Sequence, residues 1–138
     1  MTTPPSPFYR VAAKALILDE TGKLLVLIND EHRYEIPGGG WEHDETFEAC
    51  MRRELKEELQ VDLSEVGEVA FVYRGTNKTK EHHILRIAAF VKLVGQKLTP
   101  SDGMVSVEFI NREQFMKINW LAYEGNILDY VDKIWPLG

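Results

Sequence analysis

Apolar runs separated by turn residues fill the first third of the chain. Tyr9–Leu18 and Lys23–Ile28 are two such runs, and the Asp19–Gly22 segment between them has the composition of a hairpin turn. Tyr34–Ile36 predicts a third, short strand just before Pro37. The chain therefore passes through three predicted strands before it reaches a run of glycines.

The segment after the glycines has helical spacing. We predict a helix from about Thr46 to Leu59, because apolar residues recur there at intervals that place them on one face. Thr46 or Asp44 is suited to cap its first turn. The residues expected to face the core are Phe47, Cys50 and Leu55.

The second half of the chain predicts further strands and two helices. The expected strands, rich in β-branched and aromatic residues, are Glu68–Tyr73, Ile84–Leu93 and Val105–Ile110, with a turn at Gly75–Lys78. Asn111 is placed to cap a short helix that ends at Lys117. A terminal helix is predicted over Tyr123–Ile134, with packed apolar residues at Ile127, Leu128, Val131 and Ile134. This order predicts an α/β fold in which helices cover both faces of a mixed sheet.

Length and composition are those of one globular domain. The chain has 138 residues, of which 44% are hydrophobic and 28% charged. Residues 1–7, with three prolines, predict a flexible tail before a domain at 8–138. The single Cys50 has no internal disulfide partner, so we expect a buried small residue and a reducing, cytoplasmic setting. We predict neither secretion nor a membrane span, since a signal sequence and a long apolar run are both missing.

Net charge argues against a long nucleic acid as partner. The formal charge is −6, from 16 basic and 22 acidic residues, whereas phosphate backbones are held mainly by Lys and Arg. A small phosphorylated substrate is compatible with this charge if metal ions lie between it and the acidic residues.

Acidic residues gather on one face of the predicted helix. Glu54, Glu57 and Glu58 are related by i, i+3 and i+4 spacing, so they share one arc of its surface. Carboxylates held this close repel each other or bind a cation, and all-oxygen ligands favour Mg²⁺ or Mn²⁺ over zinc. The plainer alternative is a solvated helical face whose charges pair with Arg52, Arg53 and Lys56.

The spacing of this region resembles the Nudix box. Gly39 is followed after five residues by Glu45 and after seven more by Arg53-Glu54-Leu55, one residue, Glu57-Glu58, one residue, and Gln60-Val61. Gln60 is the one departure, because the box has Gly there. A left-handed conformation at that helix end would strain Gln by about 1 kcal/mol without touching the carboxylate face. The resemblance implies an α/β/α sandwich with a mixed β-sheet.

The resemblance also implies a reaction and roles for residues. Nudix enzymes hydrolyse a nucleoside diphosphate linked to another group, and Glu54, Glu57 and Glu58 match the family's metal-binding positions. Arg53 and Glu45 match a pair that braces the loop against the helix, although an ordinary surface salt bridge would explain them too. For the general base, the family leaves open a box glutamate or one from a later loop. The candidates outside the box are Glu81 and Glu108.

Several residues near the box have two interpretations each. Gly38, Gly39 and Gly40 would let a ligand approach backbone N–H groups, or simply form a turn. Trp41 could stack on a base, but packing is favoured. Adjacent His82 and His83 point to opposite faces of a strand, so a surface or substrate-loop role is favoured over zinc binding. Candidates for base recognition that also suit structural roles are Tyr34, Arg33, Asn77 and Trp120.

The box alone leaves the substrate open. The family includes enzymes for nucleoside triphosphates, nucleotide sugars such as ADP-ribose, and dinucleoside polyphosphates; an isopentenyl diphosphate isomerase also shares the scaffold, without a positive feature here. The alternative from another class is a non-catalytic nucleotide-sensing or protein-interaction module. The terminal helix could pack within the monomer or form a homodimer interface.

Overall fold

The computed structural model describes residues 6–77, 79–95, 97–101, 103–120 and 124–137. Its strands are β1 (Tyr9–Leu16), β2 (Leu24–Asn29), β3 (Tyr34–Glu35), β4 (Gly38–Gly40), β5 (Asp62–Thr76), β6 (His83–Val94) and β7 (Met104–Ile110). Its helices are α1 (Phe47–Leu59), α2 (Arg112–Lys117), the 3₁₀ helix η2 (Ile127–Tyr130) and α3 (Val131–Ile134).

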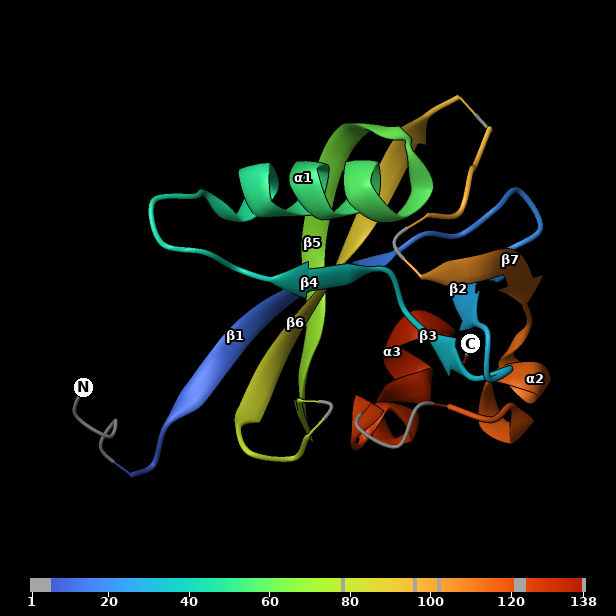
Figure 1. The fold of residues 1–138 in the computed structure, drawn as a ribbon. Coiled ribbons are helices and arrows are strands. Elements are labelled where there is room, and N and C mark those ends of the chain that lie inside the picture. The colour runs from blue at the N-terminus through green and yellow to red at the C-terminus, as the bar shows by residue number, and fades with distance from the viewer. Residues whose placement is uncertain (1–5, 78, 96, 102, 121–123, 138) are drawn as a thin grey trace.

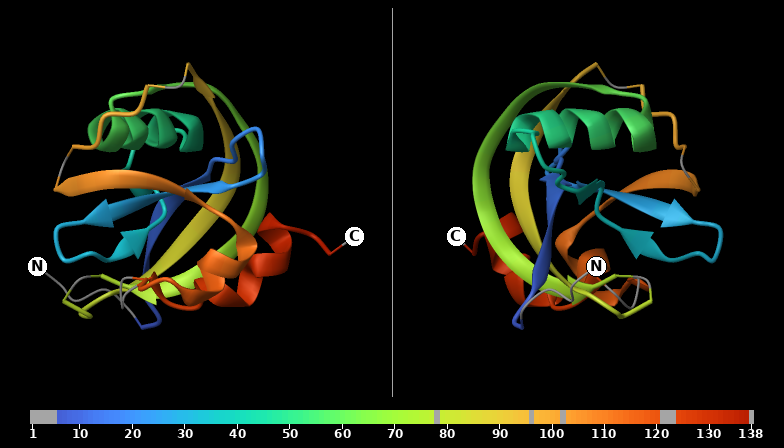
Figure 2. Two further views of the ribbon diagram at one scale, coloured as in Figure 1. Left: turned by 90° about the vertical axis from the view of Figure 1, so that its right-hand side faces the viewer. Right: turned by 60° about the vertical axis from the view of Figure 1, so that its left-hand side comes forward.

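The strands form two sheets with helices on opposite sides. The larger sheet has the order β4-β1-β6-β5, and its central pair β1–β6 is parallel while the outer pairs are antiparallel. The smaller sheet, β3-β2-β7, is antiparallel. Helix α1 lies on one side of the strands, and α2 and α3 lie on the other (Figures 1 and 2). The predicted α/β class with a mixed sheet is confirmed.

The first predicted hairpin is wrong in its extent. Its turn forms, because the Asp19 carboxylate accepts hydrogen bonds from Thr21 N and Lys23 N, both at 2.9 Å. Beyond the bridge between Leu18 and Leu24, however, the two strands separate into different sheets. Most residues of each strand are buried, and each strand finds a longer partner elsewhere: β1 pairs with β6, and β2 pairs with β7. Local composition predicts the turn, but the long-range pairing decides the sheets.

Helix α1 follows the prediction at both ends. The Thr46 hydroxyl accepts a hydrogen bond from Ala49 N at 3.0 Å and caps the start. Gln60 takes φ 52° and ψ 41°, the left-handed conformation, and its N–H donates to Lys56 O at 3.1 Å. Cys50 and Leu55 are buried and Phe47 is half-buried, so the helix lays its apolar face on the sheet.

The C-terminal helix is shorter than predicted. Its expected first residue, Tyr123, lies outside the described residues, and the rest is the 3₁₀ helix η2 followed by the single turn α3. The chain before η2 is tied to β5: Gly125 has φ 74° and lies so close to Arg74 O that a side chain would not fit, and Asn126 Oδ1 accepts from Arg74 N at 2.8 Å. The predicted apolar residues still pack within the chain. Ile127, Val131 and Ile134 are buried, and Leu128 packs against them.

Apolar side chains form two core clusters. One lies under α1 and includes Ala13, Leu25, Met51, Leu55 and Ala89. The other lies on the side of α2 and α3 and includes Leu16, Ile36, Tyr73, Phe115 and Ile127. Because residues alternate along β1, neighbouring positions of this strand contribute to different clusters. Within the described segments, no helix has the length and apolar character needed to cross a bilayer.

Candidate active site

The glycine run forms strand β4 and holds α1 close to β1. Gly38 has φ +132°, and a Cβ there would lie 2.0 Å from Ala13 O, so only glycine fits. A Cβ on Gly39 would lie 2.5 Å from the Glu54 carboxylate. The lack of side chains therefore lets the backbone of this strand touch the acidic face of the helix.

The three box carboxylates differ in environment. Glu58 is buried, and its Oε1 accepts a hydrogen bond from Gly38 N at 2.7 Å. The Glu54 side chain is 12% exposed and its Oε1 accepts from Arg53 Nη1 at 2.7 Å. The Glu57 side chain is 47% exposed and lies 3.5 Å from the same nitrogen. Glu54 and Glu58 are thus held firmly, whereas Glu57 faces solvent more freely.

Arg53 joins the loop before α1 to the helix. Its Nε and Nη2 donate to the two carboxylate oxygens of Glu45 at 2.8 and 2.9 Å, and Nη2 also donates to Gly40 O at 3.0 Å. The hydrogen bonds from Arg53 hold the pKa of Glu45 at about 2, so this carboxylate stays ionised. The geometry is that of a brace and is more extensive than a simple surface ion pair.

Burial disfavours the ionised forms of Glu54 and Glu58. Burial raises the pKa of Glu58 to about 8, although Lys14 and the Gly38 N–H act in the opposite direction. Burial also raises the pKa of Glu54, against the effect of Arg53. The site therefore favours the arrival of a positive charge.

The donor chemistry fits a hard divalent cation, but the described residues do not form a complete cage. No three carboxylate, imidazole or thiol groups within the described part of the chain converge on one point. Mg²⁺ commonly uses only one or two carboxylates and completes its coordination with water and substrate phosphates. Oxygen-only donors and the burial of Glu54 and Glu58, which a cation would offset, fit such an ion.

A later loop closes the end of α1, which the sequence did not indicate. Thr99 N donates to Leu59 O and Ser101 N donates to Glu58 O, both at 2.9 Å. Ser101 Oγ also donates to Glu57 O. These bonds satisfy carbonyls that a helix leaves without partners at its C-terminus. The backbone that carries Glu57 and Glu58 is therefore fixed from outside the box.

A buried polar cluster was also missed. Its members, called the interior polar cluster below, are Lys14, Glu35, Tyr73, Arg86 and Glu124. Tyr73 Oη donates to Glu124 Oε2 at 3.0 Å, and Lys14 Nζ donates to Ile36 O at 3.1 Å. A signal was present in the sequence: Lys14 and Arg86 each interrupt an apolar run that predicts a buried strand.

Trp41 and Cys50 have structural contacts. Trp41 Nε1 donates to Glu45 O at 2.8 Å, and its ring meets Phe47 edge to face with centroids 5.4 Å apart. Cys50 is fully buried, and burial raises the pKa of its thiol to about 11, so it stays protonated. Trp41 therefore packs at the start of α1, and Cys50 occupies a core position.

Three of the predicted base-recognition residues, Arg33, Tyr34 and Trp120, lie next to one another, whereas Asn77 lies at the β5–β6 hairpin. Trp120 Nε1 donates to Phe115 O at 2.8 Å, and Trp120 forms a bridge with Tyr34. Asn77 closes the β5–β6 hairpin, since its Oδ1 accepts from His82 N at 2.9 Å. Arg33 is half-buried next to the β2–β3 turn. Trp120 and Asn77 therefore have the structural roles that were their alternatives.

The remaining candidates lie on turns and strand surfaces. Glu81 is exposed at the β5–β6 turn, and Glu108 is exposed on β7 in the smaller sheet, where it pairs with Val26. His82 meets Phe8 with ring centroids 6.2 Å apart, and His83 meets Tyr9 at 5.9 Å. A role for Glu81 or Glu108 as the base stays a prediction.

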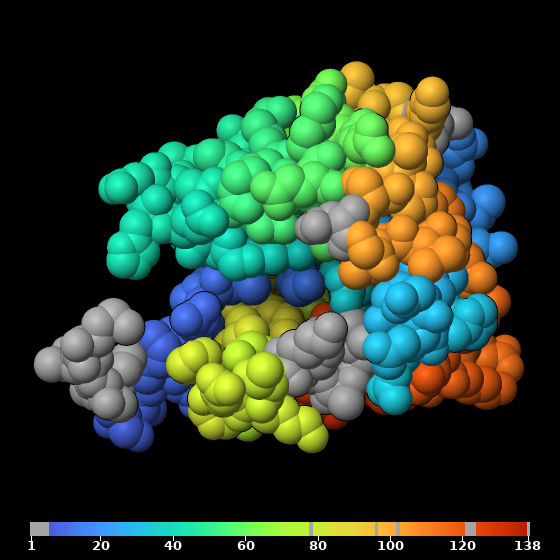
Figure 3. All heavy atoms as spheres, viewed as in Figure 1, coloured from blue at the N-terminus to red at the C-terminus, as the bar shows by residue number. Residues whose placement is uncertain are grey.

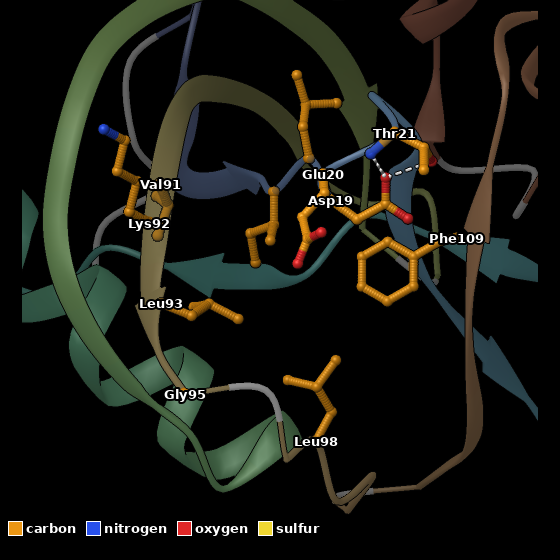
Figure 4. Close-up of a pocket in the computed structure, with 11 residues that line it drawn as sticks. Asp19, Glu20, Thr21, Val91, Lys92, Leu93, Gly95, Leu98 and Phe109 are labelled. Carbon is orange, nitrogen blue, oxygen red and sulfur yellow. Dashed lines mark hydrogen bonds between the residues drawn. The ribbon is translucent and has the colours of Figure 1, made fainter.

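The surface has a hollow next to α1. Figure 3 shows it between α1 with its preceding loop and the end of the β5–β6 hairpin, with β1 and β6 at its floor. A separate cavity of about 610 Å³ lies between Ile17–Thr21, Val91–Leu93, Leu98 and Phe109 (Figure 4). No box residue lines that cavity, and the Asp19 carboxylate in it is engaged in its own turn. We therefore place the site on the face of α1 that carries the carboxylates, against β4.

Comparison with known proteins identifies the family. The model of the NUDIX domain matches residues 8–131, so the chain belongs to the NUDIX family. A MutT-like protein of Streptomyces ambofaciens is 36% identical over 94% of this chain and 82% of its own length. An ADP-ribose pyrophosphatase of Methanocaldococcus jannaschii is 25% identical over 83% of this chain and 69% of its own. The crystal structure of a MutT protein from Methanosarcina mazei Go1 shares the fold, with a TM-score of 0.77, 21% identity and coverage of 95% and 96%.

Proposed function

We propose that this protein hydrolyses a phosphoanhydride bond in a nucleotide derivative, with Mg²⁺ or Mn²⁺ as cofactor. The observation that carries the proposal is the acidic face of α1, where Glu54 and Glu58 are fixed against side-chain-free β4 beside a surface hollow. Membership of the NUDIX family, over residues 8–131, supports it.

Glu54, Glu57 and Glu58 would hold the cation, which on binding would neutralise phosphate charge and acidify a bound water. Arg53 and Glu45 have an orienting role: they keep the loop and the helix at a fixed separation. Gly40 of strand β4 has open space where a side chain would lie, so a phosphate oxygen would fit there next to the backbone, whereas the same space at Gly38 and Gly39 is filled by Ala13 and Glu54.

Water is the nucleophile in this reaction. Its oxygen forms a new bond to one phosphorus, while the bond from that phosphorus to the bridging oxygen breaks and its electron pair leaves with the second phosphate. Glu57 is placed to take the proton of the water, because its side chain is half exposed and is held only by a 3.5 Å contact to Arg53 among the described residues. Glu58 within the box and the outer candidates Glu108 and Glu81 are the alternatives for this proton transfer.

The relatives support a nucleotide derivative as the substrate. Their names include an ADP-ribose pyrophosphatase and an RNA pyrophosphohydrolase, besides the MutT-like protein. Nucleoside triphosphates, nucleotide sugars and dinucleoside polyphosphates therefore form the panel to test.

A nucleotide sensor without turnover is the second candidate. Arg53 Nη1 contacts both Glu54, at 2.7 Å, and Glu57, at 3.5 Å. If Arg53 kept both carboxylates when nucleotide is present, it would occupy the charge that a metal ion needs. This contact is the specific observation in favour of the sensor.

The decisive experiment follows products from the nucleotide panel with Mg²⁺, with Mn²⁺ and with a chelator. We expect turnover only with metal, and a loss of about a hundredfold or more in kcat/KM for Glu57→Gln and Glu58→Gln. The metal titration separates two roles. Substitution of a residue that binds the metal should raise the metal concentration needed for half-maximal rate, whereas substitution of a residue that only takes the proton should lower kcat at an unchanged metal requirement.

Glu48→Gln is the matched control. Glu48 lies on the same helix, is exposed, and pairs with Arg52 at 3.5 Å, away from the acidic face. Saturable nucleotide binding without turnover would establish the sensor instead. Turnover that survives both Glu57→Gln and Glu58→Gln would refute the roles given to these residues. Glu81→Gln and Glu108→Gln test the outer base candidates in the same assay.

A further inference from the structure

Lys14 is a buried cation at the boundary between strand β1 and the glycine strand β4. Among the lysines that the structure describes, only this one is buried, with 6% of its surface exposed. Its Nζ donates to Ile36 O at 3.1 Å, and its ion pair with Glu124 is longer, at 3.9 Å. Burying an ammonium group is costly unless its contacts offset the loss of water. The short bond to the Ile36 carbonyl is therefore the contact to explain.

The Ile36 carbonyl belongs to a segment that β1 holds at three consecutive points. The Lys14 ammonium holds the first of them, Ile36 O. Ala15 N donates to Pro37 O at 2.9 Å. The strand register then pairs Gly38 with Lys14 itself. Both the backbone of β1 and one of its side chains therefore fix the path of this segment.

The geometry of proline couples the lysine contact to the Gly38 N–H. Each peptide group is planar, so Ile36 O lies in one rigid plane, while Pro37 O and the Gly38 N–H lie together in the next. The proline ring fixes φ between these planes, which leaves ψ of Pro37 as the one free torsion. The bond from Lys14 sets the first plane, and the bond from Ala15 N sets the second. The direction of the Gly38 N–H therefore depends on both bonds.

The Gly38 N–H in turn holds Glu58. It donates to Glu58 Oε1 at 2.7 Å, and in the described part of the chain this is the only hydrogen bond that the buried carboxylate accepts. Lys14 also acts on Glu58 through space: burial raises the pKa of Glu58 to about 8, and the Lys14 charge is the largest influence in the opposite direction. A rotation of the Gly38 peptide group would therefore misplace a carboxylate that we assign to the metal ion.

We propose that Lys14 is a positioning residue of the active site: through the Ile36 carbonyl it holds the Gly38 peptide group, and thereby Glu58, in place for metal binding. This inference rests on the proposed function, since Glu58 matters here as a ligand of the cation. The other role open to Lys14 is the supply of positive charge near the acidic face, and the two roles predict opposite effects. Loss of a positive charge alone would strengthen cation binding, whereas loss of the positioned carboxylate would weaken it.

The first test measures hydrogen exchange of the Gly38 amide by NMR, without metal or nucleotide. We expect Lys14→Met to speed this exchange about tenfold relative to that of Leu25 N, a buried amide that donates to Ile17 O at 2.9 Å. Lys92→Met, at an exposed lysine of β6, is the matched control and should leave both amides unchanged. Unchanged exchange at Gly38 in Lys14→Met would overturn the inference. An equal rise at both amides would overturn it too, because it would show a general loss of stability.

The second test measures Mn²⁺ binding by electron paramagnetic resonance, together with the metal concentration needed for half-maximal turnover. Both are measured at a temperature where each variant is folded. We expect the dissociation constant and the metal requirement to rise about 10- to 100-fold in Lys14→Met, as for other residues that orient metal ligands. Unchanged or tighter Mn²⁺ binding would overturn the inference, because a merely structural or purely electrostatic Lys14 predicts that result.

A double variant keeps the test open if Lys14→Met does not fold. Removing one partner of a buried ion pair destabilises far more than neutralising both, so Lys14→Met/Glu124→Gln spares the protein an unpaired Glu124. It should show the same changes in Gly38 exchange and Mn²⁺ binding, whereas Glu124→Gln alone should match wild type. A double variant in which Gly38 exchanges as slowly as in Glu124→Gln would overturn the inference. If wild type neither binds Mn²⁺ nor turns over nucleotides, the proposed function fails, and the Gly38 exchange alone decides whether Lys14 positions that peptide group.

Discussion

The acidic face of α1 and the interior polar cluster place ionisable residues in the protein in two different ways. On α1, Glu54, Glu57 and Glu58 come from five consecutive residues and are brought together by helical geometry. In the interior polar cluster, Lys14, Glu35, Tyr73, Arg86 and Glu124 come from β1, β3, β5, β6 and the segment before η2. The first group borders the surface, whereas the second is buried.

The difference shows how each group is stabilised. Arg53 supplies the α1 face with short charged hydrogen bonds that also reach Glu45 and Gly40, so one side chain organises the region. The interior polar cluster has longer contacts, such as 3.9 Å between Lys14 and Glu124, and retains free donors on Arg86 within the described residues. We infer that the α1 face is organised before substrate arrives.

The largest expected effect concerns the organisation of the α1 face. Arg53→Gln removes the partner shared by Glu45, Glu54 and the Gly40 carbonyl, so we expect kcat/KM to fall roughly 10- to 100-fold, as with other residues that orient metal ligands. Steady-state kinetics over a metal titration measure this. Arg52→Gln, one residue earlier and more exposed, is the control and should stay close to wild type. An equal loss in both variants would show that Arg53 acts only on helix stability.

The second prediction tests the burial of charge in the cluster. Burial raises the pKa of Glu35, against the effect of Lys14, so the native state binds this proton more tightly than the unfolded chain does. Wild-type stability should therefore decline as pH rises above the unfolded value of about 4.3 and level off above the native value. Glu35→Gln lacks this decline.

Thermal unfolding between pH 4 and pH 9, roughly the range that brackets an ordinary and a raised carboxyl pKa, measures the difference. The melting temperature of Glu35→Gln relative to wild type should be least favourable at acidic pH and should rise with pH. Glu65→Gln is the control, because Glu65 is exposed on β5. Its melting temperature relative to wild type should stay constant over this pH range. If the melting temperature of Glu35→Gln relative to wild type falls as pH rises, ionised Glu35 stabilises the fold through Lys14 and the prediction is wrong.

The smallest effect belongs to the one departure from the box. Gln60 has φ 52°, which costs a non-glycine residue about 1–2 kcal/mol, while the greater freedom of unfolded glycine offsets about 0.4–1 kcal/mol. Gln60→Gly should therefore stabilise the protein by about 1 kcal/mol or less, a rise of roughly 2–5 °C in Tm. Calorimetry and kinetics should show this gain with unchanged kcat/KM. A change in kcat/KM would connect the helix end to the acidic face.

Much of the fold was predictable where local patterns act alone. The bounds of α1, its Thr46 cap, the left-handed Gln60 and the short helix α2 follow from side-chain spacing and capping chemistry, and the structure confirms them. The prediction of one continuous terminal helix was wrong because long-range contacts decide where that helix starts. Its start is tied to β5 by Gly125 and Asn126, and contacts with a strand some fifty positions away are invisible in local periodicity.

The sequence by itself determined the family, the helix that carries Glu54, Glu57 and Glu58, and the pairing of Arg53 with Glu45, because these depend on residues within one short segment. Only the tertiary structure decided that Lys14 meets Glu124 and that Arg86 lies over Tyr73, since strand order and register set these contacts. It also decided which carboxylates are buried. Burial depends on what packs around a residue, and for these side chains the surroundings come from distant parts of the chain.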